Sequence, residues 1–96
     1  HPEKMCINFM GDAAFGMSGL DLETANRIGA PITTVLLNNG TMGGYNRALP
    51  TAMGEYNAGN MGGNYAGIAE DLGDEGKSVL LDVKTQQWLE FSEYKD

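Results

Sequence analysis

Short apolar runs predict three β-strands, over residues 4–10, 32–37 and 78–83. Each run is rich in aliphatic or β-branched side chains and is bounded by glycine or by polar residues. The first strand is expected to be buried. The second has almost no polar interruption, which is typical of a parallel strand covered on both faces.

Two helices are expected between these strands. The first begins near Ser18, because Ser18 and Asp21 form a capping-box pattern. It stops where Gly29 is followed closely by Pro31. Its apolar positions recur at roughly helical spacing: Leu20, Leu22, Ala25 and Ile28. The second helix covers residues 64–73 and is also ended by a glycine.

The order of these elements predicts an α/β fold. We expect a partial doubly wound, flavodoxin-like parallel sheet of about three strands with flanking helices, residues 1–96 forming a single, truncated domain. Residues 40–64 hold seven glycines and four asparagines without periodicity, which indicates a functional loop or disorder. Residues 84–96 carry apolar side chains and are expected to form a short amphipathic element packing on this or a neighbouring subunit: Trp88, Leu89, Phe91 and Tyr94.

Composition narrows the classes of partner. The chain has 13 acidic and 6 basic residues and a net charge of −7, which argues against a nucleic-acid backbone or an anionic membrane surface. No apolar run reaches membrane-spanning length. The lone Cys6 excludes a disulfide framework, and its apolar surroundings predict a buried structural thiol. The start, HPEKMC, resembles no signal peptide, so a cytoplasmic setting is expected.

Polar residues follow the first two strands where each ends. Asp12 follows the first strand, and Asn38 and Asn39 follow the second. Because carboxyl ends of neighbouring parallel strands share one edge of the sheet, a carboxylate and an amide oxygen are expected to meet there. A hard cation bridging such oxygens to a phosphate fits this chemistry. Taken singly, Asp12 is typical of a turn or cap, and Asn39-Gly40 of a turn or, with Thr41, a glycosylation sequon.

The combination carries a resemblance to a known family. The segment GDAAFGMSGLDLETANRIGAPITTVLLNNG resembles the thiamine diphosphate motif, in which Gly-Asp is followed some two dozen residues later by Asn-Asn. It is similar to the C-terminal diphosphate-binding domain of acetolactate synthase, benzaldehyde lyase, oxalyl-CoA decarboxylase and 2-hydroxyacyl-CoA lyase. The resemblance covers residues 4–73, and SVLLDVKT resembles a later strand of the same domain.

This resemblance implies a set of binding residues. Thiamine diphosphate and Mg²⁺ are the implied cofactors, and the metal would be held by the Asp12 carboxylate, the Asn39 side-chain oxygen and the Thr41 backbone carbonyl. Two diphosphate oxygens and a water would complete an octahedron. Residues 40–63 match the segment that closes over the cofactor in relatives. The implied cofactor-binding residues are Gly11, Asp12, Ala13, Ala14, Asn39, Thr41, Met42 and Gly43, with backbone N–H groups of Ala13, Ala14 and Met42 or Gly43 on the phosphates.

The resemblance also implies a reaction class. It points to a lyase, decarboxylase or acetolactate synthase-like transferase acting on a 2-keto acid or on a 2-hydroxyacyl- or oxalyl-CoA substrate. A glutamate from another domain activates the cofactor in relatives, so the remaining domains of the enzyme or another copy of this chain are the expected partners, as a homo-oligomer. Two alternatives stay open. One is a non-catalytic remnant serving oligomerisation or interaction, and the other is a flavodoxin-like nucleotide binder.

Overall fold

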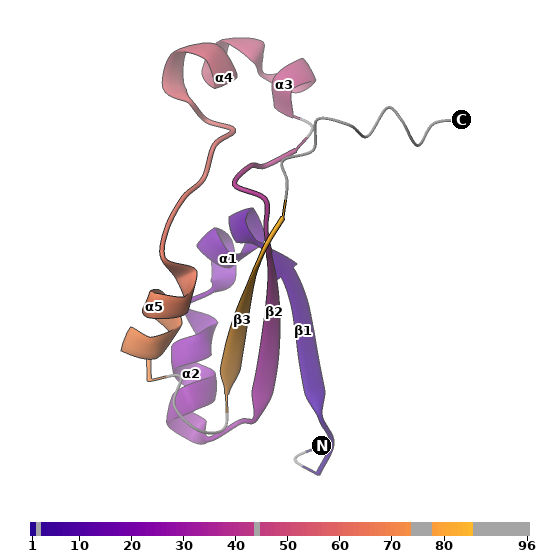
Figure 1. The fold of residues 1–96 in the computed structure, drawn as a ribbon, viewed down its shortest axis with the longest axis vertical. Helices are drawn as coiled ribbons and strands as arrows, with labels where there is room; N and C mark the ends of the chain where they lie inside the picture. The colour runs from indigo at the N-terminus through magenta and orange to yellow at the C-terminus, as the bar shows by residue number, and fades with distance from the viewer. Residues whose placement is uncertain (2, 44, 74–77, 86–96) are drawn as a thin grey trace, which may run out of the picture.

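The computed structural model describes residues 1, 3–43, 45–73 and 78–85. Its centre is an all-parallel sheet in the order β1-β2-β3, formed by β1 (Cys6–Gly11), β2 (Ile32–Asn38) and β3 (Val79–Lys84). The helices are α1 (Asp12–Ser18), α2 (Asp21–Ile28), α3 (Tyr45–Ala48), α4 (Pro50–Tyr56) and α5 (Tyr65–Asp71). Figure 1 shows this order of strands, with α1, α2 and α5 beside the sheet. The predicted α/β fold with a partial parallel sheet is confirmed.

One hydrophobic core joins the sheet to α1, α2 and α5. Leu36 on the central strand is fully buried, and Leu80 on β3 is nearly so. Side chains alternate between the two faces of a strand, so these two leucines lie on the same face of adjacent strands. The helices contribute the other buried members of the cluster: Phe15, Leu22, Tyr65 and Ala69. The core is therefore built on a single face of the sheet.

The opposite face of the sheet is exposed in the part of the chain that the structure describes. Phe9 is 67% exposed, Leu37 45% and Leu81 50%. The expectation that the first strand is buried, and the second on both faces, is wrong for these residues. A right-handed crossover between successive strands in the order 1-2-3 places each connecting helix on the same side. Cys6 is likewise exposed, which corrects the predicted buried thiol.

Two helices, and not one, connect β1 to β2. The predicted cap at Ser18 is wrong: Ser18 is the last residue of α1, and its hydroxyl donates to the Ala14 carbonyl at 3.4 Å. The chain turns at Gly19, where any side chain would collide with the backbone oxygen and ring of Phe15. The predicted stop of the second of these helices is confirmed, because Gly29 is left-handed with φ of 72°.

The glycine-rich segment contains secondary structure that its composition concealed. Helices α3 and α4 lie within residues 40–64, which corrects the prediction of a segment without elements. Figure 1 shows both helices beyond the end of the sheet, and α4 buries none of its residues. The predicted helix before β3 is confirmed as α5, whose cap residue Asn64 accepts a hydrogen bond from the Gly67 N–H at 3.1 Å. The predicted element within 84–96 lies outside the described residues beyond Thr85.

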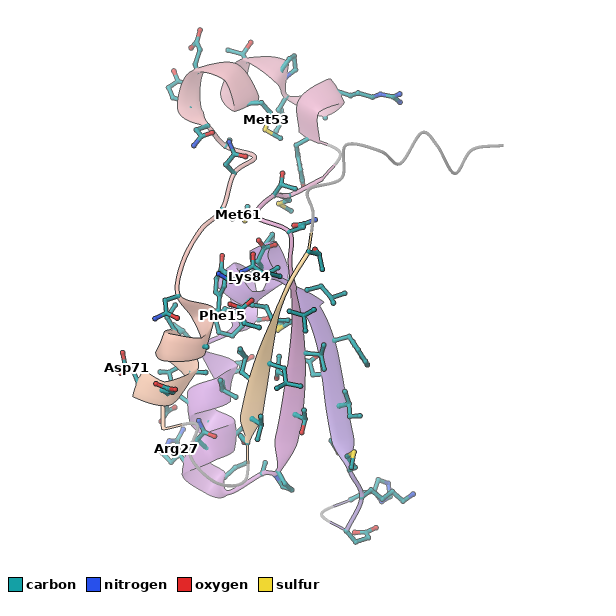
Figure 2. All side chains as sticks on the ribbon, viewed as in Figure 1. Phe15, Arg27, Met53, Met61, Asp71 and Lys84 are labelled. Atoms are coloured by element: carbon teal, nitrogen blue, oxygen red, sulfur yellow. The ribbon has the colours of Figure 1, made fainter. Side chains whose placement is uncertain are left out.

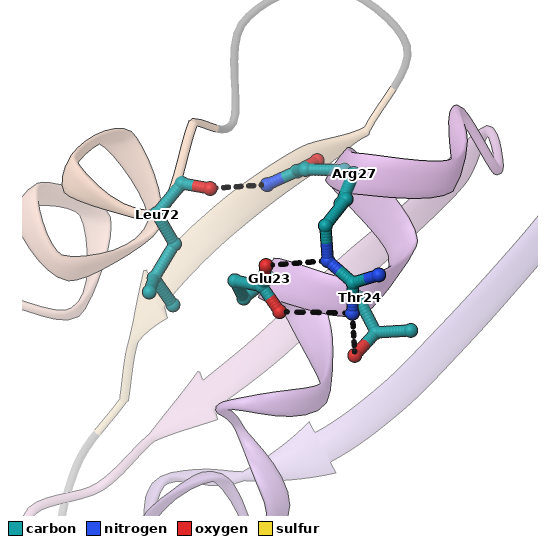
Figure 3. Close-up of polar contacts among 5 residues, drawn as sticks. Glu23, Thr24, Arg27 and Leu72 are labelled. Atoms are coloured by element: carbon teal, nitrogen blue, oxygen red, sulfur yellow. Dashed lines mark hydrogen bonds and ion pairs between the residues drawn. The ribbon is translucent and has the colours of Figure 1, made fainter.

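Polar contacts tie α2 to its neighbours (Figure 3). The Asn26 side chain donates to the Leu72 carbonyl at 3.1 Å, linking α2 to the end of α5. On the solvent side, Arg27 Nε donates to Glu23 Oε1 at 2.8 Å. This hydrogen bond, with the guanidinium charge, holds the pKa of Glu23 below its ordinary value. Because the ion pair is exposed, it contributes little to stability. Within the described ranges, no helix has the length and apolar character needed to cross a membrane.

Replacing Leu36 by Ala tests the position of the core. Leu36 is 0% exposed at the centre of the sheet, so Leu36→Ala is expected to lower the free energy of unfolding by about 2–5 kcal/mol in urea denaturation. The matched control is Leu20→Ala, because Leu20 is 74% exposed and is expected to change stability by about 0.5 kcal/mol or less. Equal losses for the two variants would contradict this assignment of the core.

Candidate functional site

The Asp12 carboxylate joins the ends of β1 and β2. It is the first residue of α1 and only 2% exposed. Its Oδ1 accepts the Ala13 N–H at 3.0 Å, and its Oδ2 accepts the Gly40 N–H at 2.8 Å. A buried carboxylate is stable only when donors replace its lost hydration, and these two backbone groups do so. The predicted meeting of the two strand ends at one edge of the sheet is thus observed.

Asn39 lies beside this contact and folds back on its own loop. Its Oδ1 accepts the Thr41 N–H at 3.1 Å, an arrangement in which an asparagine side chain replaces a backbone turn. An amide oxygen has two lone pairs, and a carboxylate has about four acceptor directions in total. Asn39 Oδ1 and the two oxygens of Asp12 therefore keep acceptor capacity after their backbone hydrogen bonds are counted.

The loop after β2 is fastened at its base by a short antiparallel bridge between Thr41 and Asn60. In addition, the Thr41 hydroxyl donates to the Gly59 carbonyl at 2.8 Å. These contacts join the two ends of the loop that carries α3 and α4, so the loop is closed at its base, at the edge of the sheet. The backbone bonds of the bridge are Met42 N–H to the Gly59 carbonyl and Met61 N–H to the Gly40 carbonyl, both 2.9 Å.

This bridge fixes the direction of the Thr41 backbone. The inter-strand bonds are made by the neighbours of Thr41 and Asn60, so the two residues form a non-hydrogen-bonded pair. In such a pair the N–H and C=O groups of each residue point away from the partner strand. The Thr41 N–H points to Asn39 Oδ1, and the Thr41 carbonyl is directed to the same side. The Thr41 carbonyl therefore lies on the side of the bridge that faces Asn39.

The remaining residues implied by the family resemblance differ in the hydrogen bonds that their backbone groups make. Gly11 is the extended cap residue of α1. The Ala13 N–H already donates to Asp12, and the Met42 N–H already donates to Gly59. Ala14 stands in the first turn of α1, where backbone N–H groups have no partner inside the helix. Gly43 is exposed, and a side chain built there would meet no atom within 4 Å.

Sequence reasoning missed one polar residue under this edge. Asp82 lies on β3 and accepts a hydrogen bond from the Asn38 side chain at 3.1 Å. It holds the end of β2 one residue before Asn39. Asp82 lies two residues after Leu80 and therefore on the same, helix-covered face of β3. A carboxylate at an inward-facing strand position is the sequence signal that could have identified it.

Tyr65, which opens α5, also lies under this edge; from the sequence it could line the active-site side of the glycine-rich loop or serve a structural role. It is 6% exposed, and its ring packs edge-on against Phe15, with ring centroids 5.6 Å apart. Figure 2 labels Phe15, which α1 presents towards the sheet and α5. Burial raises the pKa of the Tyr65 phenol above its ordinary value, and the negative charges of Asp12 and Asp82 raise it further. The phenol therefore lies in the field of both carboxylates.

The charge and the donor set of this edge suit one kind of metal. Both ion pairs that the described residues form, His1–Glu3 and Glu23–Arg27, involve neither Asp12 nor Asp82. The described part of the chain has no group of three or more His, Cys, Asp or Glu able to hold a metal ion. A cation here would thus take one carboxylate, neutral oxygens and oxygens of its ligand. Mg²⁺ binds in this way in phosphate-binding sites, so the residues fit it.

Comparison with known proteins places this site in a family. Residues 1–90 match the family model described as thiamine pyrophosphate enzyme, C-terminal TPP binding domain. The chain belongs to this family. Among curated proteins, pyruvate decarboxylase 4 of Arabidopsis thaliana is 32% identical over 89 residues, which are 92% of this chain and 14% of that relative. This thiamine pyrophosphate-binding domain therefore spans a small part of the length of the relative it matches.

Tyr65→Phe tests the electrostatics of the site. Because the folded pKa of Tyr65 lies above its unfolded value of about 10, its contribution to stability is complete below pH 10. That contribution is lost as the pH rises through the folded pKa. We expect wild type to lose stability more steeply than Tyr65→Phe above pH 10 in thermal melts. The difference in phenolate absorbance between the two proteins is expected to titrate above pH 10, and a midpoint at or below 10 would contradict the assignment.

Proposed function

We propose that this domain holds the diphosphate group of thiamine diphosphate through Mg²⁺ at the edge formed by β1 and β2. Asp12, Asn39 and the Thr41 carbonyl are the proposed metal ligands. The observation that carries the proposal is the buried Asp12 carboxylate bonded to the Gly40 N–H, one residue after Asn39. A carboxylate and neutral oxygens beside the first turn of α1 suit a metal-bound diphosphate.

In this proposal, different residues supply the charge, the neutral ligands and the phosphate contacts of the site. Asp12 supplies the negative charge for the cation, and its two backbone hydrogen bonds hold it in place before the cofactor arrives. Asn39 and Thr41 supply neutral oxygens, fixed by the contact between them. The Ala14 and Gly43 N–H groups are proposed to meet phosphate oxygens, because Ala13 and Met42 already donate within the chain. When bound, the cofactor supplies the chemistry of carbon–carbon bond cleavage next to a carbonyl.

The substrate class is part of the proposal. A 2-keto acid decarboxylase or lyase is favoured, and the relative named pyruvate decarboxylase 4 supports it. The other reactions included in the proposal are acetolactate synthase-like transfer and action on a 2-hydroxyacyl- or oxalyl-CoA substrate. Whichever applies, the cofactor-activating glutamate is proposed to come from another domain or from another copy of the chain. The setting is proposed to be cytoplasmic and the assembly a homo-oligomer.

A non-catalytic binding or interaction module is the second candidate. The exposed face of the sheet favours it, because large apolar side chains on a strand surface mark a site of contact. Turnover of a 2-keto acid by the purified chain with thiamine diphosphate and Mg²⁺ would exclude this candidate.

Asp12→Asn tests the proposed metal ligand by cofactor-induced stabilisation. At a cofactor concentration about tenfold above the Kd, binding adds about 1.4 kcal/mol to the free energy of unfolding. For a domain of this size that raises the Tm by about 5–10 °C. We expect wild type to show this rise when thiamine diphosphate and Mg²⁺ are both present. Asp12→Asn is expected to lose it, because a neutral amide binds Mg²⁺ far more weakly than a carboxylate.

Asp71→Asn is the matched control for this experiment. Asp71 is exposed at the end of α5, away from the strand ends, so this variant is expected to keep the full rise in Tm. Each variant is compared with its own Tm without cofactor, which separates binding from any change in basal stability. An unchanged rise in Asp12→Asn, or no rise in wild type at millimolar cofactor, would overturn the proposal.

A further inference from the structure

A polar pair on two adjacent strands lies between the hydrophobic core and the loop after β2. The Asn38 side chain, at the end of β2, donates to Asp82 Oδ1 on β3 at 3.1 Å. In the register of the sheet Asp82 lies beside Leu36, two residues before Asn38, so the pair is a diagonal contact on one face. That face is the one covered by helices, because Leu36 is fully buried on it.

The backbone of Asn38 is held by the same neighbouring strand. The Thr85 N–H donates to the Asn38 carbonyl at 2.8 Å. Asn38 is thus joined to β3 through its side chain and its carbonyl, and it is the last residue of β2. The Asn38 carbonyl and the Asn39 N–H belong to one planar peptide unit. The two contacts therefore fix the direction in which Asn39 leaves the sheet.

The chain after Asn38 reaches the Asp12 carboxylate within two residues. Gly40 is the second of them, and its N–H donates to Asp12 Oδ2 at 2.8 Å. Two residues of extended chain span at most about 7 Å, so a displacement at Asn38 is carried to Gly40. Asp82 holds one end of this short stretch and Asp12 holds the other. Asn39 lies between them.

Asp82 has two possible ways to act on this stretch. Burial raises the pKa of the Tyr65 phenol, and the charges of Asp12 and Asp82 raise it further, so both carboxylates act on the same buried region. The negative charge of Asp82 would attract a cation, whereas its hydrogen bond would position the loop. The geometry favours the hydrogen bond, because Asp82 Oδ1 is directed to the Asn38 side chain.

We infer that Asp82 is a positioning residue of the site. Its hydrogen bond to Asn38 fixes the end of β2, so that Asn39 and the Gly40 N–H are in place before a ligand binds. A loop ordered in advance costs less to immobilise on binding. The effect on the cofactor rests on the proposed function, in which Asn39 is a metal ligand and Asp82 is not.

Two substitutions of Asp82 separate the hydrogen bond from the charge. Asp82→Asn removes the charge but keeps an acceptor oxygen for Asn38, and Asp82→Ala removes both. In titration calorimetry with thiamine diphosphate at a fixed Mg²⁺ concentration, we expect Asp82→Ala to raise the Kd about tenfold, as loss of a hydrogen bond to a charged group does. Asp82→Asn is expected to stay within about twofold of wild type. Equal losses in the two variants would overturn the inference, because charge alone would then explain them.

Asp71→Ala is the matched control, because it removes one carboxylate from an exposed position at the end of α5. It is expected to keep the Kd of wild type. Asn38→Ala removes the other partner of the contact and is expected to weaken binding as much as Asp82→Ala. The double variant Asn38→Ala with Asp82→Ala is then expected to show no further loss. Additive losses would show that the two residues act separately and would contradict the inference.

Hydrogen exchange without any ligand tests the positioning itself. The rate at the Gly40 N–H is measured by NMR relative to the rate at the Leu36 N–H in the core. Asp82→Ala is expected to raise this ratio about tenfold, and Asp82→Asn to leave it near that of wild type. A general loss of stability would accelerate both amides, so an unchanged ratio in Asp82→Ala would overturn the inference. If wild type binds no cofactor, the proposed function fails, and this ratio still decides the role of Asp82.

Discussion

The hydrogen bond from the Gly40 N–H to the buried Asp12 carboxylate is the constraint on which the site depends. A carboxylate removed from water must find donors, and Asp12 finds one beside it in sequence and one 28 residues away. The second bond holds the loop after β2 against the beginning of α1. Asn39 and Thr41 take their positions from that contact, so removal of the carboxylate charge would loosen the loop as well as remove a proposed ligand.

The sheet beneath the site explains why it lies at one edge. Both connections between strands cross the same face, and the chain leaves each strand at the same end. Polar loops therefore collect at the carboxyl ends, while the core, with Leu36 at its centre, lies below them. Asp82 and Tyr65 extend the polar region downward from this edge and connect it to β3 and α5.

The segment that carries α3 and α4 combines a fixed base with a loosely packed end. Its base is the bridge between Thr41 and Asn60, reinforced by the hydroxyl of Thr41 on Gly59. Its far end has few buried contacts, as the exposed α4 shows. Segments with few buried contacts open at low free-energy cost. The proposed function uses this difference, since a loosely packed end would admit the cofactor while Asn39 and Thr41 stay in place.

The amino-acid sequence by itself determined the three strands, the end of α2 at Gly29, the helix that precedes β3 and the approach of Asp12 to the loop after β2. Those features follow from local periodicity, glycine conformations and the rule that parallel strands share an edge. Only the tertiary structure decided the rest. Ser18 ends a helix because the turn at Gly19 packs against Phe15. One face of the sheet lacks a described cover because both crossovers run on the same side. An apolar pattern shows which side chains favour burial, but it does not show which element buries them. Tyr65 and Asp82 are 53 and 70 residues away from Asp12 in the sequence and approach it only through tertiary packing. Sequence periodicity carries no information over such separations.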